Sequence, residues 1–551
     1  MELVERRVAL GSHGSPPRAG IVASGVSLSH PDGSSALVDV DLAIAPGRLT
    51  AVIGPSGAGK TTLLRVLAGL VSPDRGTVRY ETEAGDSSEV RVGYVPQDDI
   101  LHPELPLRRT LEFAAALRLP RANGDARRAA VDGALVTLGL DAQAHLPVGS
   151  LSGGQRKRAS VASELLADPA VCVLDEPTSG LDPSSSVALL RCLRLACDQG
   201  RTVAFTTHSV SDLEACDAVV VVGRGGRLVA AGAPGEVLDA LGAGSFTELY
   251  ELLDEAPAPV PVGPTLGRRR RSRRARGPAG PGVAVQVRYV ATLTRRGGEV
   301  LVHNPLTLAI VLGSPMAVIA MFVVLFQPVG APVVGADPTS SVMVAYWLAF
   351  AAFFFGLTFG LLQVCTETPI LRREHHAGVS SGAYLASKLV LLGPLLVAIN
   401  LVMVIVLRLL DRLPAMPAGR VGALLVTMAL DALAGLALGL LASAAVGSPA
   451  QAALALPMLC FPAVLFSGAM VPVPVMAGAG RAIAALMSDR WAFEAIAVHL
   501  GVVERLPVGA PQSSLGSSPV TSYWLVLIAF TVVLGTAAVA MVRWRAVTGR
   551  D

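Results

Sequence analysis

The string Gly54-Pro55-Ser56-Gly57-Ala58-Gly59-Lys60-Thr61 constrains the fold of this 551-residue chain more than any other feature. It has the form G-x-x-x-x-G-K-[ST], in which glycines let backbone N–H groups surround phosphate oxygens at the start of a helix. The apolar residues 51–53 predict a short buried strand before it, and the leucine spacing predicts a helix over 62–70 after it. The order strand, phosphate loop and helix predicts an α/β domain that binds a nucleotide. The candidate ligands are Gly54, Pro55, Ser56, Gly57, Ala58, Gly59, Lys60, Thr61 and Thr62.

Within this loop, Lys60 is expected to reach the β- and γ-phosphates, and Thr61 is expected to hold Mg²⁺. Two carboxylates, Asp175 and Glu176, follow a second apolar strand at 171–174. Ligands bind at the carboxyl ends of parallel strands, which is where both groups would lie. Asp175 suits the Mg²⁺ shell, and Glu176 suits a general base or a group that orients water. An acidic cap on the turn at 177–179 is the alternative interpretation.

The string Leu151-Ser152-Gly153-Gly154-Gln155 stands between the phosphate loop and these carboxylates. On its own it predicts only a glycine turn at the start of a basic helix. In this context it resembles the signature sequence of ABC ATPases, and the resemblance extends over roughly residues 21–240. The string Ser179-Gly180-Leu181-Asp182 matches the D-loop of that family, Gln97 its Q-loop glutamine and His208 its switch histidine.

The resemblance implies a head-to-tail dimer with two ATP molecules between the protomers. It implies catalytic roles for Glu176, His208 and Gln97, and Mg²⁺ contacts from Thr61, Gln97 and Asp175. The facing protomer would contribute the start of the signature helix, whose free N–H groups can bind a γ-phosphate. The contacts implied from the facing protomer are Ser152, Gly153 and Gly154, and Gln155 and Asp182 are further candidate nucleotide-binding residues.

One position departs from the family pattern. The family stacks adenine on an aromatic residue about two dozen positions before the phosphate loop, and His30 has the only ring in that region. Stacking of adenine on His30 is one hypothesis, and a solvated turn histidine is the other.

The second half of the chain has the composition of a membrane domain. Hydrophobic residues make up 52% of the chain and charged residues only 16%, and the mean hydropathy of +0.56 is too high for a soluble ATPase. The excess follows residue 300, where uncharged stretches accommodate six membrane spans of about 20 residues each. With Asp431 inside the fourth, we place them near 305–326, 342–364, 389–407, 421–443, 450–470 and 522–542.

We expect a protein of the cell membrane whose ATPase domain is cytoplasmic, because the ATPase needs cellular ATP. An even number of spans, six, would return the C-terminus to the cytoplasm. Flanking arginines mostly agree with the positive-inside rule, but Arg408, Arg412 and Arg420 fall on the outer side. Residues 1–20 lack an apolar core, so no secretory signal is expected. None of the six cysteines falls in the outer segment 471–520, and we expect buried, reduced thiols.

A linker of different composition joins the halves. Residues 268–276 hold seven arginines in nine positions, which favours anionic lipid headgroups over nucleic acid, with a solvated tether as the plain alternative. The segment 283–296 has one apolar face, which predicts an interfacial connecting helix, although its start also alternates like a strand. The expected organisation is a tail (1–20), an ATP-binding domain (21–245), this linker (246–282), the connecting helix (283–304) and a membrane domain (305–545).

An ATPase followed by six spans resembles the G-subfamily of ABC exporters and its bacterial half-transporter relatives. The segment 367–374 is similar to the first cytoplasmic coupling segment of that group, which makes Glu367, Arg372, Arg373 and Glu374 the candidate transmission residues. A solvated charge cluster is the alternative. Asp431 is a functional candidate because a mid-span carboxylate is costly, although a structural hydrogen bond would also explain it. The pairs Gly356/Gly360 and Gly435/Gly439 predict close helix packing.

The fold class we predict is an α/β P-loop ABC ATPase followed by an all-α transmembrane domain. The function we predict is ATP-hydrolysing export, by a homodimer with Mg²⁺, of a hydrophobic or amphipathic substrate such as a lipid, glycolipid or drug. A non-transporting ATP-driven membrane regulator and one half of a heterodimeric exporter are the alternatives. Fold-level analogy does not choose the substrate.

Overall fold

The computed structural model describes residues 18–30, 32–82, 90–255, 282–328, 338–505, 515 and 518–548. The chain divides into two compact units, residues 1–285 and 286–551. The Arg-rich run 268–276 lies outside the described residues. The fold class predicted from the sequence is confirmed, because the first unit is α/β and the second is helical.

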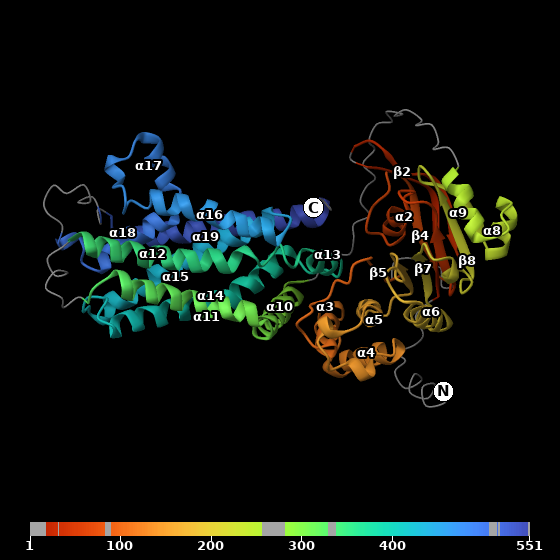
Figure 1. The fold of residues 1–551 in the computed structure, drawn as a ribbon, viewed down its shortest axis with the longest axis horizontal. Coiled ribbons are helices and arrows are strands. Elements are labelled where there is room, and N and C mark those ends of the chain that lie inside the picture. Colours follow the sequence, from red (N-terminus) through yellow and green to blue (C-terminus); the bar gives the residue numbers. More distant parts are fainter. Residues whose placement is uncertain are drawn as a thin grey trace. The chain divides into compact units, whose positions relative to one another are not determined.

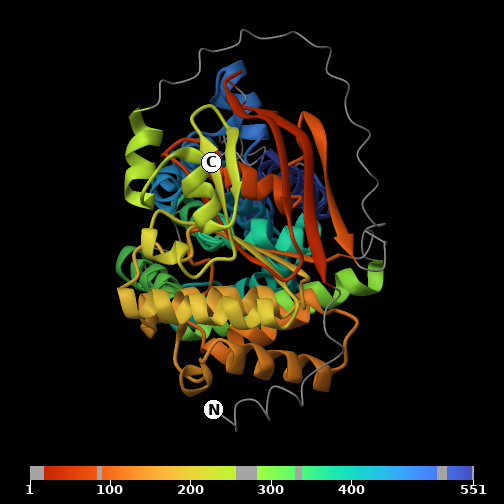
Figure 2. The same cartoon turned by 90° about the vertical axis from the view of Figure 1, so that its right-hand side faces the viewer.

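A three-stranded antiparallel sheet begins the first unit. Its strand order is β2 (Ser35–Ile44), β1 (Ala19–Ser29) and β4 (Arg75–Thr82), with Ile21 opposite Ile44 and Val22 opposite Arg79. Figure 2 shows β1 and β2 side by side in red. The inward residues of β1 and β2 are apolar and alternate with exposed ones along β2, as expected for a sheet with one buried face.

A six-stranded sheet forms the centre of the first unit. Its order is β5 (Val92–Val95), β6 (Val171–Leu174), β7 (Thr202–Thr206), β3 (Leu49–Ile53), β8 (Ala218–Gly223) and β9 (Arg227–Gly232). All neighbours are parallel except β8 and β9. Every residue of β3, β6 and β7 is buried, because helices cover one face of the sheet and the three-stranded sheet with the helix after β3 covers the other.

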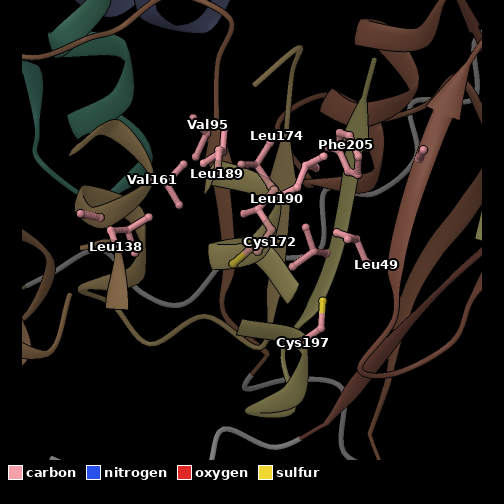
Figure 3. Close-up of a cluster of buried hydrophobic side chains, with 14 of the residues drawn as sticks. Leu49, Val95, Leu138, Val161, Cys172, Leu174, Leu189, Leu190, Cys197 and Phe205 are labelled. Atoms are coloured by element: carbon pink, nitrogen blue, oxygen red, sulfur yellow. The ribbon is translucent and has the colours of Figure 1, made fainter. Parts of the chain in front are cut away.

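Helices supply the rest of the core of this unit. They are α2 (Lys60–Leu67), α3 (Leu107–Arg118), α4 (Gly124–Thr137), α5 (Gly153–Leu165), α6 (Pro183–Asp198), α7 (Val210–Leu213), α8 (Pro234–Leu241) and α9 (Phe246–Glu255). Figure 3 shows Leu189 and Leu190 of α6 and Val161 of α5 meeting Leu174 and Cys172 of β6. This cluster fixes the central strands, and therefore the loops that follow them.

The second unit consists of helices. They are α10 (Val283–His303), which begins at the boundary, α11 (Pro305–Leu325), α12 (Pro338–Leu361), α13 (Thr368–His376), α14 (Ser381–Leu409), α15 (Ala418–Ala445), α16 (Pro449–Phe466), α17 (Gly478–Ala485), α18 (Ser488–His499) and α19 (Val520–Thr548). In Figure 1 the long helices run side by side, with α10 and α13 towards one end and α17 and α18 towards the other. The segment 283–296 is therefore helical, as part of α10.

Five helices in the described residues are long and apolar enough to cross a membrane: α11, α12, α14, α15 and α19. Each overlaps a span predicted from the sequence. The sixth predicted span, 450–470, corresponds to the shorter α16, which ends at Phe466. The helix ends there because Gly468 adopts the left-handed conformation (φ 88°), which glycine permits after a helix.

The two glycine pairs predicted to pack helices do so against each other. A Cβ added to Gly356 on α12 would lie 1.9 Å from the carbonyl oxygen of Ala432 on α15. A Cβ on Gly435 would lie 2.4 Å from the carbonyl oxygen of Phe353, and one on Gly439 would lie 2.5 Å from that of Leu357. The backbones of α12 and α15 therefore touch along this seam, which only glycine allows.

The three arginines that oppose the positive-inside rule have local partners. Arg412 donates to the carbonyl oxygen of Phe326 at the end of α11. Arg408 donates to the Met416 carbonyl at 3.3 Å, and Arg420 forms an ion pair with Glu504 at 3.4 Å. The three guanidinium groups thus form hydrogen bonds with backbone carbonyls near helix ends or an ion pair with a nearby carboxylate, which gives them a structural role.

Candidate functional site

Four neighbouring strands place the predicted nucleotide site at one edge of the central sheet. The phosphate loop follows β3, and Asp175 and Glu176 follow β6. His208 lies two positions after the end of β7, and Gln97 lies two positions after the end of β5. Because β5, β6, β7 and β3 are parallel neighbours, their carboxyl ends share an edge. Residues separated by more than 150 positions in the sequence therefore converge there.

The phosphate loop holds Lys60 at the start of α2. The Lys60 ammonium is buried and donates to the carbonyl oxygens of Gly54 at 2.8 Å and Pro55 at 3.0 Å. Burial lowers the pKa of Lys60, and the charges of Glu176 and Asp175 oppose that shift. Gly59 has φ 93°, and a Cβ there would lie 2.4 Å from the carbonyl oxygen of Ala36. Glycine is thus required where the loop passes β2.

Thr61 and Asp175 form a set of oxygen ligands that fits Mg²⁺. The Thr61 hydroxyl donates to Asp175 Oδ1 at 3.0 Å, and the Thr206 hydroxyl donates to the same oxygen at 2.8 Å. Tyr94 donates to Asp175 Oδ2 at 3.4 Å. A carboxylate and a hydroxyl are hard oxygen ligands of the kind that Mg²⁺ takes together with phosphate oxygens.

Glu176 lies between the two other predicted catalytic groups. The Gln97 amide donates to Glu176 Oε2 at 2.9 Å, and His208 Nε2 lies 3.0 Å from Glu176 Oε1. The Glu176 backbone has φ 44°, an uncommon left-handed conformation, and its N–H donates to the Thr206 hydroxyl at 2.7 Å. The structure therefore brings the side chains of Gln97, Glu176 and His208 together.

The signature residues form the exposed start of α5. The Ser152 hydroxyl accepts from the Gln155 N–H at 3.3 Å, and the Gln155 amide oxygen accepts from the Ser152 N–H at 2.9 Å, which is a capping box. Ser152 and Gly153 are exposed. Asp182 caps α6 in a similar way, and hydrogen bonds from Ser184 and Ser185 lower the pKa of its carboxyl.

Sequence reasoning missed the contacts that fix the Q-loop. The Lys157 ammonium donates to the backbone carbonyl of Gln97 and lies 3.7 Å from the Asp99 carboxylate. Arg156 lies 3.9 Å from the same carboxylate. Burial raises the pKa of Asp99, against the opposing charges of Lys157 and Arg156. The basic run after the signature string was the available signal, and its role is to join α5 to the Q-loop.

A second missed group is a buried carboxylate behind the switch histidine. The hydroxyls of Thr178 and Thr207 both donate to Asp212 Oδ2 at 2.6 Å. The Tyr250 hydroxyl donates to the Thr207 carbonyl at 3.3 Å. Asp212 therefore links the segment after Glu176 to the segment that carries His208. No local motif marks it.

His30 lies in the exposed turn between β1 and β2. Its N–H donates to the Ser34 carbonyl at 2.8 Å. Ala36, six residues later, is the residue that Gly59 approaches. The turn thus leads into the strand beside the phosphate loop. Stacking of adenine on His30 stays a hypothesis.

The candidate transmission residues occupy α13 and the residue before it, in the second unit. Glu367 accepts from Lys388 and from the Tyr384 hydroxyl, both at 2.8 Å, and Glu374 pairs with Arg296 of α10 inside the protein. Arg372 and Arg373 lie on the same helix. The two carboxylates therefore hold α13 to α10 and α14. In the same unit, Asp431 is fully buried on α15 and accepts from the Ser488 hydroxyl at 3.1 Å.

Comparisons with known proteins agree with this division of the chain. The family model described as ABC transporter matches residues 37–179, and the model described as ABC-2 type transporter matches residues 288–500. An ABC transporter ATP-binding/permease protein of Mycobacterium tuberculosis is 32% identical over 546 residues, which cover 93% of this chain and 61% of that protein.

Two further relatives match shorter stretches of the chain. ABC transporter G family member 26 of Arabidopsis thaliana is 42% identical over 174 residues, which cover 30% of this chain and 25% of that protein. The Nod factor export ATP-binding protein I of Burkholderia pseudomallei is 38% identical over 213 residues, which cover 38% of this chain and 69% of that protein. The chain thus spans less than two thirds of the length of the mycobacterial and plant relatives.

Proposed function

The chain belongs to the ABC transporters, with an ABC ATPase domain followed by an ABC-2 type membrane domain, and from this premise we propose that it is a half-transporter whose homodimer hydrolyses ATP to export a hydrophobic or amphipathic substrate. The observation that carries the proposal is the convergence of Lys60, Asp175, Glu176 and His208 at one sheet edge, on the chain that also holds the membrane helices.

The residues suit phosphoryl transfer to water. Lys60 would exchange its loop carbonyls for phosphate oxygens, and Thr61 with Asp175 would hold Mg²⁺, which neutralises developing charge on the phosphates. Glu176 would orient the attacking water and accept its proton. Gln97 and His208 contact the two different oxygens of Glu176, so both can position that carboxylate.

The exposed signature supports dimerisation. Ser152 and Gly153 leave the start of α5 open to solvent, although a helix N-terminus is a favourable place for phosphate. A second copy placed head to tail would bring that N-terminus to the γ-phosphate. The intact set of site residues means that both sites of a homodimer would be competent.

The family and the membrane helices support the proposed export and the proposed orientation. A cytoplasmic ATPase requires the start of α11 to face the cytoplasm, and with α16 as a sixth span the C-terminus would return there. The substrate class rests on the lipid-accessible, aliphatic helices α11, α14 and α19, whose large apolar side chains are widely exposed. A lipid, a lipid-linked sugar and a hydrophobic drug all fit this description.

The test is ATP turnover of the purified protein in lipid nanodiscs across a panel of those three substrate classes. We expect one class to stimulate turnover, and Glu176→Gln to lower turnover about 100-fold or more while ATP binding remains. Glu251→Gln, an exposed carboxylate on α9, is the matched control and should leave turnover unchanged. Turnover that depends on Glu176 but responds to no substrate, with no movement of substrate in sealed vesicles, would instead favour an ATP-driven regulator or a missing partner subunit.

A further inference from the structure

Two carboxylates are buried on packed helices of the second unit, away from solvent. Asp431 on α15 and Asp489 on α18 are both 0% exposed. The Ser488 hydroxyl donates to Asp431 Oδ1 at 3.1 Å, and the charge of Asp431 acts directly on Asp489, the residue that follows Ser488. In the described part of the chain, Asp431 Oδ2 and both oxygens of Asp489 have no hydrogen-bond partner. Three carboxylate oxygens are thus buried without a donor.

The basic groups on the surrounding helices are engaged elsewhere or exposed. Arg490 of α18 pairs with Glu494 at 3.0 Å, Lys388 of α14 with Glu367, and Arg420 of α15 with Glu504. On the other packed elements, Arg408 and Arg545 donate to backbone carbonyls, and Arg481 of α17 and Arg543 of α19 are exposed. His499 of α18 contacts the Thr427 hydroxyl at 3.0 Å. Among the described residues, neither Asp431 nor Asp489 forms an ion pair.

The remaining titratable neighbours carry hydroxyl or thiol groups. The charge of Asp489 acts on Tyr346 of α12 and on Cys460 of α16, while Tyr523 of α19 faces Glu494. These groups bring no positive charge. Two ionised carboxylates here would each lose their hydration and would repel each other. A proton on the pair removes one charge and adds the missing O–H donor.

The hydroxyl of Tyr346 is a further buried polar group that lacks a hydrogen-bond donor or acceptor in the part of the chain that the structure describes. Its side chain is 0% exposed, and its hydroxyl oxygen has no partner among the described residues. Its ring packs on Phe493 with 6.3 Å between centroids, and Phe493 lies one turn after Asp489 on the same face of α18. The charge of Asp489 acts on this hydroxyl, so Tyr346 belongs to the same buried polar region as Asp489.

We propose that Asp431 and Asp489 form a proton-binding site between α15 and α18, in which the two carboxyl groups hold at least one shared proton and Tyr346 completes the hydrogen bonds. The proton is taken from water and lies between carboxylate oxygens. Its loss would leave two negative charges buried in one region and would weaken the packing of α18 on α15 and α12. This site would make the α18 end of the membrane domain sensitive to pH, whichever substrate the protein moves.

The direct test is infrared spectroscopy of the full-length protein in nanodiscs at neutral pH, with and without carboxyl-¹³C-labelled aspartate. We expect a C=O stretch of a protonated carboxylic acid that shifts with the aspartate label and in D₂O. The band should disappear in the Asp431→Asn/Asp489→Asn variant and persist in Glu504→Gln, a matched change of an exposed carboxylate. Since the labelled wild type is sufficient, the test stands even where the double variant does not fold.

A second measurement separates a proton from a metal cation. We expect the thermal midpoint at neutral pH to be the same in Na⁺, K⁺ and choline at equal ionic strength, and to be retained in Asp489→Asn, since an amide has the shape of a protonated acid. No aspartate-dependent band at neutral pH, or a midpoint raised by Na⁺ or K⁺ in wild type but not in Asp489→Asn, would overturn the proposal. The second result would identify a cation as the occupant.

Discussion

At the scale of single residues, Thr206 holds the two carboxylates of the hydrolysis site in place. Its hydroxyl donates to Asp175 and accepts from the Glu176 N–H. Thr206→Val keeps the shape and removes both bonds, so we expect a loss of about 1–3 kcal/mol of stability and a fall in turnover of about tenfold or more. Thermal unfolding and ATP turnover measure the two effects.

The control for Thr206 is Thr50 on the neighbouring strand β3. Its hydroxyl is also buried, but Thr50 Oγ1 has no hydrogen-bond partner among the described residues. Thr50→Val should therefore be neutral or stabilising, because it removes an unsatisfied polar group. Equal losses in both variants would mean that the hydroxyl of Thr206 has no special role.

The buried thiols predict that the stability of the folded chain falls as the pH becomes alkaline. Burial raises the pKa of Cys172, Cys197 and Cys216 to about 12, whereas thiols of the unfolded chain ionise near about 8.5. The folded form thus binds more protons between these values, so the stabilisation is complete below about pH 8.5 and declines as pH rises towards 12. Each thiol contributes a slope of up to about 1.4 kcal/mol per pH unit.

The measurement is the thermal midpoint of the full chain from pH 8.5 upward, for wild type and for the variant with all three cysteines changed to alanine. We expect the midpoint of the variant to fall less steeply with pH, even where its absolute value is lower because cavities remain. Parallel pH curves would show that these thiols do not set the slope.

Residues with a family motif could be predicted, and their supporting partners could not. Gln97, Glu176 and His208 were predicted from strings and spacing, and the structure brings them together. Thr206 and Asp212 were missed because a threonine at a strand end and an aspartate in a short helix have no local signature. Their roles arise from strand pairing, which places β6 beside β7.

At the scale of elements, the α12–α15 seam depends on the absence of side chains. Gly435→Ala would place a methyl group 2.4 Å from the Phe353 carbonyl oxygen, so the helices must separate. We expect a loss of about 1–3 kcal/mol, typical of overpacking, measured as a lower thermal midpoint in detergent. Gly422→Ala on the same helix meets no atom within 4 Å and should be neutral or slightly stabilising. A similar loss in both variants would argue against backbone contact as the cause.

A buried ion pair holds α10 to α13. Arg296 bonds to both oxygens of Glu374, with Nη2 to Oε2 at 3.2 Å, and both side chains are less than a tenth exposed. Burial disfavours the charged guanidinium, but Glu374 outweighs it and raises the pKa of Arg296. Arg296→Met leaves Glu374 buried and unpaired, so we expect a loss of about 3–5 kcal/mol in chemical unfolding.

Two variants make this prediction specific. Arg296→Met combined with Glu374→Leu should recover most of the loss, because no buried charge remains. Arg295→Met removes the adjacent arginine, which is 72% exposed and pairs with Glu299 at 3.6 Å, and should cost no more than about 1 kcal/mol. Failure of the double variant to recover would show that packing of the arginine stem, rather than charge, holds the helices.

At the scale of the whole molecule, composition and hydropathy predict the two-part architecture, because long uncharged runs are incompatible with a soluble surface. They do not predict which helices touch, with one exception: the glycine pairs on α12 and α15 indicated a contact that the structure shows. The packing of α18 on α15, which buries Asp431 and Asp489 in one region, was beyond sequence reasoning, since the two residues are 58 positions apart and α18 has no span-like pattern. Asp489 was read only as part of a long outer segment.

The assembly into homodimers gives the last prediction. Ser56 lies at the exposed tip of the phosphate loop and Ser152 at the exposed start of α5. In a head-to-tail dimer these positions face each other across the ATP, because one protomer binds the phosphates through the loop and its partner through the signature. Ser56→Cys with Ser152→Cys, in the Glu176→Gln background that retains ATP, should crosslink between chains, as dimer-sized product in denaturing electrophoresis.

The dependence on nucleotide decides what such a crosslink means. Product should form with ATP and Mg²⁺ and decrease without them, since closure requires the phosphates between the two surfaces. Thr77→Cys in place of Ser152→Cys, on the exposed strand β4, should give no such product. A purified protein that hydrolyses ATP but forms no nucleotide-dependent crosslink would contradict the homodimer. If it does neither alone, yet both with a second half-transporter added, the functional unit is a heterodimer and this chain supplies only one half of it.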